Sequence, residues 1–276
     1  MKELNCRLIV SDFDGTLANS ENQVPESVVN AINAYVNDGG IFAVCTGRIL
    51  PSVLPCARGM GLKGLVVACQ GSVIAEIETG KIIRNVCFAP AEAAEICRTV
   101  EELNENVQLY FGNGFYSSLP ADEKHLNYYE SIIGVTALHS DLPLSEVAAG
   151  GKKAFNKVAV LCRPEAQAEL FKKLAARLGS KFDVTCSAKV LIEIAPLGET
   201  KGAAVEFLCA HYGVPVESCC AVGDNLNDIT MIERAGVGVA VGNAEKELKE
   251  VADYITVTND EGAVAAVIEK FGYKEV

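Results

Sequence analysis

Short apolar runs alternate with amphipathic segments along the first third of the chain. Between the first two runs, Pro25 opens a segment with helical spacing of apolar residues, and Gly39 follows its end. Runs this short, separated by a helix, are typical of buried parallel strands. The runs that predict strands are Cys6–Ser11, Ile41–Cys45 and Leu65–Cys69.

The pattern changes between residues 88 and 188, after a predicted hairpin at 72–86. Helical and strand-like segments now follow one another without regular alternation, which indicates an inserted α+β domain at 88–188. The expected helices are Ala91–Leu103, Ala121–Ile132 and Pro164–Leu178; the expected strands flank Asn113-Gly114, cover Lys157–Cys162 and include two short ones after residue 178; a loop is expected around Pro143.

From Val190 the alternation of strands and helices returns. Leu191–Ala195 is predicted as the next strand of the parallel sheet, and the helix Thr200–Tyr212 follows it. The core is therefore expected to be discontinuous, made of residues 1–87 and 189–276. The further predicted strands are Cys219–Val222, Val237–Val241 and Tyr254–Val257, and a helix from Glu261 closes the chain. The predicted fold class is α/β, with a parallel-sheet core and a large α+β insert.

Composition restricts the classes of function. The 276 residues are 50% hydrophobic, enough for a substantial core, and the formal net charge of −12 argues against binding nucleic acid through its phosphates. The absence of an apolar run of about 18 residues argues against membrane insertion. Eleven cysteines, several within apolar runs, are expected to be buried thiols of a reducing, cytoplasmic compartment. Three scattered histidines give little support to a zinc site.

Pairs of acidic residues follow two of the predicted strands. Asp12 and Asp14 come directly after the first strand, and Asp224 and Asp228 follow the strand Cys219–Val222. Because ligands of parallel sheets bind outside the carboxyl ends of the strands, Asp12, Asp14 and Asp224 could converge on one Mg²⁺ site. Two alternatives stay open: a solvated Asp-x-Asp-Gly turn at the first pair, and a helix-capping role for Asp228.

Two further segments favour the binding of an anion. Thr46 and Gly47 lie between a strand and the start of a helix, where free N–H groups attract negative charge. Lys201 lies at the start of a predicted helix, an unfavourable place for a cation unless an anion compensates it; the alternative is an ordinary exposed lysine. The G-x-G-x-x-G match at 59–64 ends a helix and precedes a strand, the reverse of a dinucleotide-binding fingerprint.

Taken together, these segments resemble the haloacid dehalogenase superfamily of phosphohydrolases, and their order resembles its Cof-type phosphatase branch. The motifs that carry the resemblance are Asp12-Phe13-Asp14-Gly15-Thr16, Thr46-Gly47-Arg48, Lys201-Gly202 and Gly223-Asp224-Asn225-Leu226-Asn227-Asp228. The resemblance spans almost the whole chain and implies a Rossmann-like core with the insert as a cap domain. One departure is Gln70-Gly71, where that branch usually has Asn-Gly.

The resemblance also implies residue roles. Asp12 would be the nucleophile and Asp14 the general acid and base, with Lys201 as the third catalytic residue. Asp12, Asp14 and Asp224 would hold Mg²⁺, and Asp228 would orient the groups around it. The residues implied to hold the phosphoryl group are Thr46, Gly47, Lys201 and Asn227.

The leading hypothesis is a Mg²⁺-dependent phosphatase of small phosphate monoesters, with sugar phosphates and related metabolites as expected substrates and an aspartyl-phosphate on Asp12. The alternatives are a phosphomutase of the same fold and a non-catalytic metabolite-binding protein. We expect a monomer or small homo-oligomer. In the insert, Tyr116, Asp122, Lys124 and His125 could select the substrate or could be ordinary exposed residues.

Overall fold

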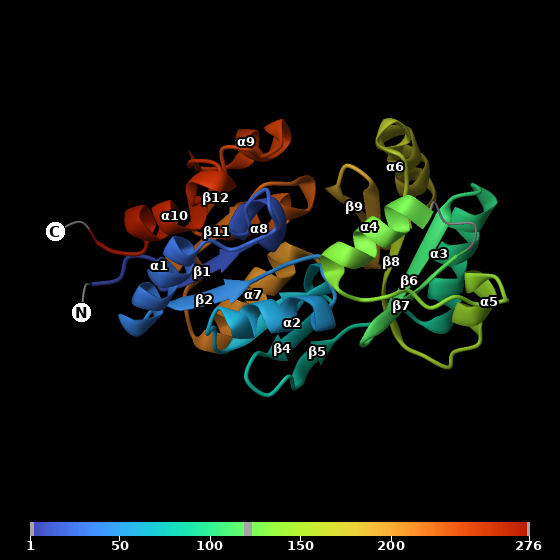
Figure 1. Ribbon diagram of the computed structural model, residues 1–276, viewed down its shortest axis with the longest axis horizontal. Helices are drawn as coiled ribbons and strands as arrows, with labels where there is room; N and C mark the ends of the chain where they lie inside the picture. Colours follow the sequence, from blue (N-terminus) through green and yellow to red (C-terminus); the bar gives the residue numbers. More distant parts are fainter. Residues whose placement is uncertain (1–2, 119–122, 275–276) are drawn as a thin grey trace.

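A computed structural model describes residues 3–118 and 123–274 (Figure 1). One of its two halves, the core, is formed by both ends of the chain and is built on a five-stranded, all-parallel sheet in the order β13-β12-β11-β1-β2. Two strands distant in sequence, β1 and β11, pair at its centre. The strands are β1 (Leu8–Ser11), β2 (Ile41–Val44), β11 (Cys219–Gly223), β12 (Val237–Ala240) and β13 (Tyr254–Ile255). This confirms the predicted Rossmann-like core.

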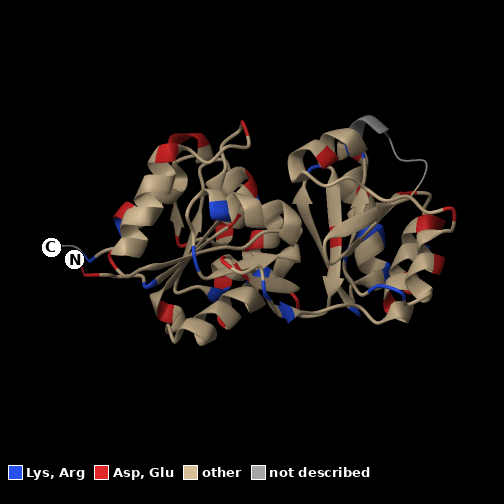
Figure 2. Cartoon of the chain, turned by 60° about the horizontal axis from the view of Figure 1, so that its bottom comes forward, with Lys and Arg blue, Asp and Glu red and all other residues tan. Residues whose placement is uncertain are grey.

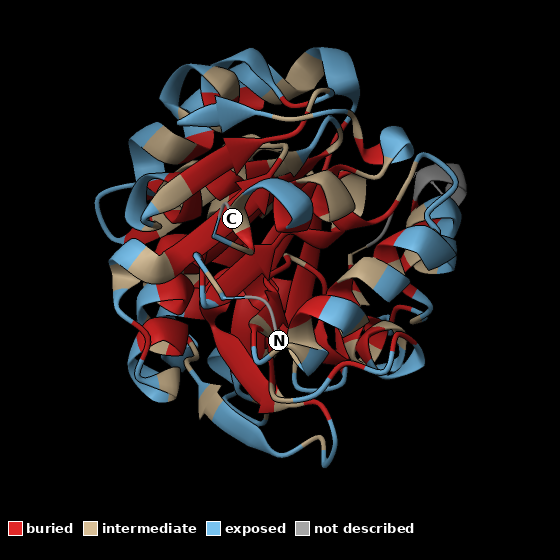
Figure 3. Cartoon of the chain, turned by 90° about the vertical axis from the view of Figure 1, so that its left-hand side faces the viewer, coloured by how far each residue is buried: buried red, intermediate tan, exposed pale blue. Residues whose placement is uncertain are grey.

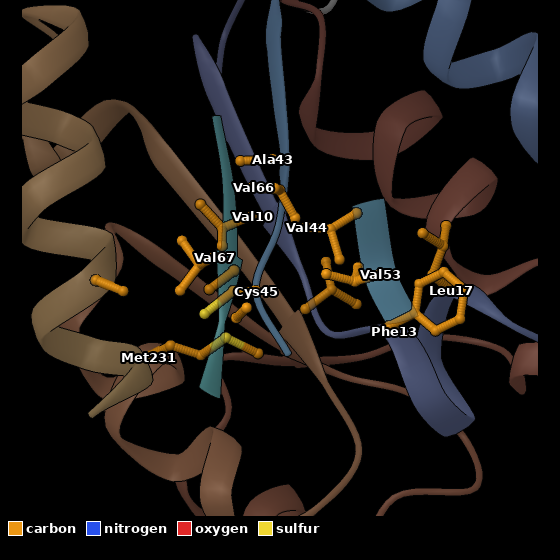
Figure 4. Packing of buried hydrophobic residues seen from close by; sticks show 14 of the residues in the cluster. Val10, Phe13, Leu17, Ala43, Val44, Cys45, Val53, Val66, Val67 and Met231 are labelled. Atoms are coloured by element: carbon orange, nitrogen blue, oxygen red, sulfur yellow. The ribbon is translucent and has the colours of Figure 1, made fainter. Parts of the chain in front are cut away.

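Helices cover both sides of this sheet and leave most of its strands buried, whereas the edge strand β13 is exposed (Figure 3). One pair of helices, α1 and α10, packs together, and so does the pair α7 and α8. Valine and isoleucine are common among the buried side chains of this core, as Figure 4 shows for Val10, Val44 and Val67. The helices are α1 (Glu26–Asn37), α2 (Leu50–Gly59), α7 (Lys201–Tyr212), α8 (Ile229–Arg234), α9 (Lys246–Val251) and α10 (Ala263–Phe271).

A small antiparallel sheet leads out of the core. Its strands are β3 (Leu65–Ala68), β4 (Val73–Glu76) and β5 (Ile82–Asn85). The pairing of β4 with β5 confirms the predicted hairpin. The strand at Leu65–Cys69 was expected in the parallel sheet, but β3 pairs antiparallel with β4 instead. A bridge between Cys45 and Val67 joins β3 to the end of β2.

The insert forms the other half of the molecule, and its five-stranded sheet is antiparallel, in the order β7-β6-β8-β10-β9. The strands are β6 (Asn106–Phe111), β7 (Gly114–Ser117), β8 (Phe155–Leu161), β9 (Phe182–Ala188) and β10 (Leu191–Pro196). The prediction that the parallel sheet resumes at Leu191–Ala195 is wrong, because β10 pairs antiparallel with both β8 and β9. The return to the core therefore comes after Pro196. A short apolar run is compatible with a parallel or an antiparallel sheet, so the sequence could not show to which sheet this strand belongs.

Four helices complete the insert: α3 (Pro90–Glu102), α4 (Glu123–Ile133), α5 (Leu144–Ala149) and α6 (Pro164–Leu178). The loop expected around Pro143 is followed by α5, which has only six residues and so shows no clear periodicity in the sequence. In Figure 1, α4 lies over the side of the insert that faces the core, whereas α3, α5 and α6 lie farther from it.

Alternation along the strands of the insert separates its two faces. In β10, Ile192 and Ile194 join the hydrophobic cluster under the insert's helices, whereas Leu191 and Glu193 point toward the core. In β8, Val158 and Val160 likewise pack toward the helices. The other face of this sheet therefore becomes one wall of the space between the two halves.

Other sequence-based expectations concern charge and cysteine. Lys and Arg residues lie scattered among Asp and Glu over both halves (Figure 2). All eleven cysteines are free thiols. Among the described helices, none has the length and apolar character needed to cross a membrane.

Candidate active site

The two acidic segments meet at the carboxyl ends of β1 and β11. These strands pair in register from Leu8 with Cys219 to Ser11 with Val222, so the loops that follow them start side by side. Carboxylate oxygens of Asp12, Asp224 and Asp228 lie within 4.8 Å of one another. Asp12 is 5% exposed, so the alternative of a solvated turn is wrong for Asp12, whereas the side chain of Asp14 is 43% exposed. Asp228 is fully buried.

Lys201 lies inside this acidic cluster. Its Nζ donates hydrogen bonds to Asp12 Oδ1 and to Asp228 Oδ1, each at 2.5 Å. Burial alone would lower the pKa of Lys201, but the charges of Asp12 and Asp228 raise it above its usual value. The side chain is 1% exposed, so the alternative of an ordinary exposed lysine is wrong.

Asp228 combines two roles. While Oδ1 accepts from Lys201, Oδ2 accepts hydrogen bonds from the backbone N–H groups of Asp224 (2.9 Å) and Asn225 (3.0 Å). The capping alternative therefore describes one oxygen of Asp228 and the ion pair the other. Both oxygens are engaged, so the carboxylate acts as a fixed support for Lys201 and for the loop.

Asp224 is placed by the loop after β1. Its Oδ1 accepts a hydrogen bond from Thr16 Oγ1 at 2.8 Å. Gly15, with φ of +77°, allows this approach, since a Cβ there would lie 2.6 Å from Asp224 Oδ2. Burial, together with the charge of Asp228, raises the pKa of Asp224 to about 7.

The charges of the cluster do not balance. Asp12, Asp224 and Asp228 supply three carboxylates, and Lys201 supplies one ammonium group. Burial, outweighing the attraction of Lys201, raises the pKa of Asp12 well above its usual range. Excess negative charge on carboxylate oxygens is what a hard divalent cation such as Mg²⁺ neutralises, so these residues fit such an ion.

Asp14 lies outside this cluster. Its two oxygens accept hydrogen bonds from Arg48, at 2.8 Å from Nε and 2.5 Å from a terminal nitrogen. Arg48 also approaches the carbonyl oxygen of Ile132 in α4 at 3.5 Å, so it contacts both halves of the molecule. Its position within Thr46-Gly47-Arg48 was the signal in the sequence, but no role was predicted for it.

Thr46 and Gly47 form the loop at the end of β2. Thr46 Oγ1 accepts a hydrogen bond from the N–H of Arg48 at 3.1 Å, which leaves the hydroxyl proton free to be donated to an anion. The carbonyl oxygen of Gly47 accepts a hydrogen bond from Lys157 Nζ at 2.7 Å. The insert therefore holds this loop from the opposite side.

A buried polar network, which we call the Lys157 network, joins the insert to the core. Lys157 pairs with Glu193 Oε1, while Glu193 Oε2 accepts from the side-chain amide of Gln70. Gln70 Oε1 accepts from Asn227 Nδ2 at 3.1 Å. Gln70, the departure from the usual family motif, thus lies between the cap and the acidic loop. The signal in the sequence was a single charge within each apolar run that contains Lys157 or Glu193.

A cavity of about 380 Å³ lies between the two halves. Lys201 is not among the lining residues, but it donates a hydrogen bond to Asp12, which is. The predicted site residues that line the cavity are Asp12, Asp14, Thr46, Gly47, Asp224 and Asn227. Tyr116 is not among the lining residues; its ring packs beside Phe111 instead. Asp122 and the side chains of Lys124 and His125 lie outside the described part of the chain.

Comparison with known proteins agrees with this geometry. The family model of haloacid dehalogenase-like hydrolases matches residues 9–268. Phosphatase YwpJ of Bacillus subtilis is 30% identical over 95% of this chain and 99% of its own. An HMP-PP phosphatase of Yersinia enterocolitica is 27% identical over 88% of this chain and 86% of its own. The structure of a haloacid dehalogenase-like hydrolase from B. subtilis has a TM-score of 0.84 and 27% identity, covering 96% and 99% of the two chains.

The order of the motifs, the fold and the acidic cluster at the ends of β1 and β11 thus agree with the family match, which covers all but the ends of the chain. The chain belongs to the haloacid dehalogenase-like hydrolases.

Proposed function

We propose that the protein is a Mg²⁺-dependent phosphatase that hydrolyses small phosphate monoesters through an aspartyl-phosphate on Asp12. The observation that carries the proposal is the buried carboxylate cluster around Lys201, whose Asp12 and Asp224 line the polar end of the cavity. Such a site can neutralise a phosphoryl group and present a carboxylate to phosphorus at once. The relatives named as phosphatases support it.

In the first half-reaction, an oxygen of Asp12 attacks phosphorus and the bond from phosphorus to the ester oxygen breaks. Asp14 gives its proton to the departing alkoxide, which leaves as the alcohol. Because Arg48 binds both oxygens of Asp14, this step requires Arg48 to loosen its hold when substrate enters. Thr46 Oγ1 and Lys201 Nζ donate to the phosphoryl oxygens throughout.

In the second half-reaction, water attacks the phosphorus of the Asp12 ester. Asp14, now ionised, takes a proton from that water, the acyl phosphate bond breaks, and Asp12 is restored together with inorganic phosphate. Asp228 holds Lys201 in place during both steps.

Asp12 and Asp224 are the side chains proposed to hold Mg²⁺. The carboxylate of Asp14 was expected to join them, but Arg48 binds it, so we do not assign it to the ion. The ion, when bound, offsets the repulsion between the Asp12 carboxylate and the phosphoryl group.

Substitution of Asp14 by Asn tests the proposal. An aryl phosphate needs little protonation of its leaving group, so Asp14→Asn should release about one equivalent of phenol in a burst. Turnover should then slow by about 10²- to 10⁴-fold, with phosphate trapped on Asp12. Asp12→Asn is the control and should show no burst.

Steady turnover by Asp14→Asn at the wild-type rate, or failure to trap labelled phosphate by acid quench, would remove the assignment. The same assays address the alternatives: a phosphomutase would depend on a bisphosphate activator, and a non-catalytic protein would show no Mg²⁺-dependent turnover in the presence or absence of EDTA. Sugar phosphates, the cytoplasmic location and the oligomeric state stay predictions.

A further inference from the structure

The cavity has two unlike ends. The end formed by the core carries the carboxylates, Thr46 and Arg48, whereas the end formed by the insert is mainly apolar. The side chains of the apolar wall are Tyr128, Tyr129, Ile132, Ile133, Leu161 and Leu191. A bound ester would place its phosphoryl group at the first end and its leaving group against this wall.

The polar atoms of the wall are largely engaged with other protein groups. The hydroxyl of Tyr129 lies 2.8 Å from the hydroxyl of Tyr110, which also contacts Gln108 Oε1 at 2.6 Å. Tyr129 therefore turns its hydroxyl away and offers the ring. Both oxygens of Glu193 are used, one by Lys157 and one by Gln70.

A leaving group with many hydroxyls would lose hydrogen bonds to water in this place. Each buried, unpaired hydroxyl weakens binding, whereas an apolar surface gains from contact with the wall. The hydroxyl of Ser187 in β9, which also lines the cavity, can meet one polar substituent. The volume of about 380 Å³, close to the lower end of ordinary ligand sites, suits one ring system beside a phosphate.

We infer that the preferred substrate is the phosphate monoester of an alcohol attached to a flat, weakly polar ring, rather than a sugar phosphate. The inference rests on the proposed phosphatase function and narrows its substrate class. Rings of Tyr128 and Tyr129 provide the faces against which such a ring packs.

Two esters of primary alcohols test the inference, because the leaving groups have similar basicity. The value of kcat/KM for benzyl phosphate is expected to exceed that for a hexose 6-phosphate by about tenfold or more. An equal or higher value for the hexose ester would overturn the inference. Acetyl phosphate, which has almost no leaving group to recognise, reports the basic phosphatase activity in the same Mg²⁺ buffer.

Binding separates this inference from the proposed function. If acetyl phosphate is not hydrolysed, the proposed function fails, yet calorimetry with benzylphosphonate and with a hexose 6-phosphonate still compares the two classes without turnover. Tighter binding of benzylphosphonate supports the ring-binding wall, and tighter binding of the hexose analogue rejects it.

A variant of Tyr128 tests whether the apolar wall causes the preference for the benzyl ester. Tyr128 is 65% exposed at the rim, so Tyr128→Ala should fold normally. It should lower kcat/KM for benzyl phosphate about two- to tenfold relative to the hexose ester, and Tyr128→Phe should restore the ratio. Leu142→Ala, which removes another exposed apolar side chain of the insert outside the cavity, is the matched control. An unchanged ratio in Tyr128→Ala would count against the wall.

Discussion

Two buried lysines, one in each half of the molecule, contact residues that line the cavity, and their surroundings differ. Lys201 belongs to the core and faces Asp12 and Asp228, with Asp224 close to both. Lys157 belongs to the insert and forms an ion pair with Glu193. Each lysine is 1% exposed, and in both cases neighbouring carboxylates outweigh burial and raise the pKa of the lysine. Burial alone therefore does not distinguish a catalytic lysine from a structural one.

The balance of charge distinguishes them. Lys157 has one carboxylate partner, a carbonyl oxygen of Gly47 and the ring of Tyr110 at 4.2 Å, so its surroundings are complete without another ion. Around Lys201 the carboxylates are in excess, which leaves negative charge for a cation to neutralise. A buried lysine in a balanced pair fastens parts of a fold together, whereas one in an unbalanced cluster marks a reactive site.

The comparison predicts that substitutions of the two lysines differ most in their effect on catalytic activity. Lys201→Met removes a donor to the phosphoryl group, and kcat for acetyl phosphate should fall by about 10²- to 10³-fold. Lys157→Met should lower kcat far less, because Lys157 contacts the phosphate loop only through the carbonyl oxygen of Gly47. Steady-state kinetics of the purified variants at saturating Mg²⁺ measure both.

The stability of the same variants provides the control. Lys157→Met leaves Glu193 buried without its partner and should lower the free energy of unfolding by about 3–5 kcal/mol. The double variant Lys157→Met with Glu193→Met should regain much of that loss. Equal losses of activity in Lys157→Met and Lys201→Met would break the distinction between a structural and a catalytic lysine.

Metal affinity should separate the carboxylates within the acidic cluster. Asp228 uses both oxygens for Lys201 and backbone N–H groups, whereas Asp224 accepts a side-chain hydrogen bond from Thr16 at one oxygen. Removal of a residue that supports a metal ligand typically lowers metal affinity by about 10- to 100-fold, and removal of the ligand itself should lower it further. Titration of Mg²⁺ by calorimetry should therefore show a larger loss for Asp224→Ala than for Asp228→Ala. Equal losses would remove the distinction.

The acidic cluster was predictable because its parts follow strands that any reader of the sequence would place in one parallel sheet. Asp12 and Asp224 are more than two hundred positions apart, yet the pairing of β1 with β11 brings their loops together. The positions of the acidic residues at the ends of predicted strands were therefore sufficient to predict that they lie close together. The roles of individual residues were less accessible, as Asp14 shows: nothing in its sequence context indicates that Arg48 binds both its oxygens.

The apolar wall and the Lys157 network were not predictable, for a different physical reason. The Lys157 network and the wall residues Leu161 and Leu191 depend on which face of an antiparallel strand meets the core, and β10 was expected in the wrong sheet. The other wall residues lie on α4, which was predicted as a helix, but the sequence did not show that this helix lies over the cavity. Glu193 and Leu191 reach the cavity only because β10 pairs with β8 and β9. A one-residue change of register would have turned Ile192 toward the core instead.

The smallest expected effect concerns pH and compares the two clusters once more. With a folded pKa of about 7, Asp224 binds a proton more tightly in the folded protein than in the unfolded chain, whose aspartate pKa is about 3.9. Between these values the folded state holds more protons, so the free energy of unfolding should fall as pH rises toward about 7 and then level off. Lys157 contributes no slope in this range, because its raised pKa affects stability only at alkaline pH.

The contribution of this site to the free energy of unfolding, measured by urea unfolding in EDTA, should therefore be greater at about pH 5.5 than at about pH 8. Asp224→Asn should make the dependence less steep, since an amide cannot titrate while Asp12, whose pKa is also raised, still does, and it should raise the stability of the metal-free protein at the higher pH. Saturating Mg²⁺ should reverse the trend, because the ion binds the ionised carboxylates. A slope in EDTA that is the same in wild type and Asp224→Asn would show that Asp224 does not carry the excess charge.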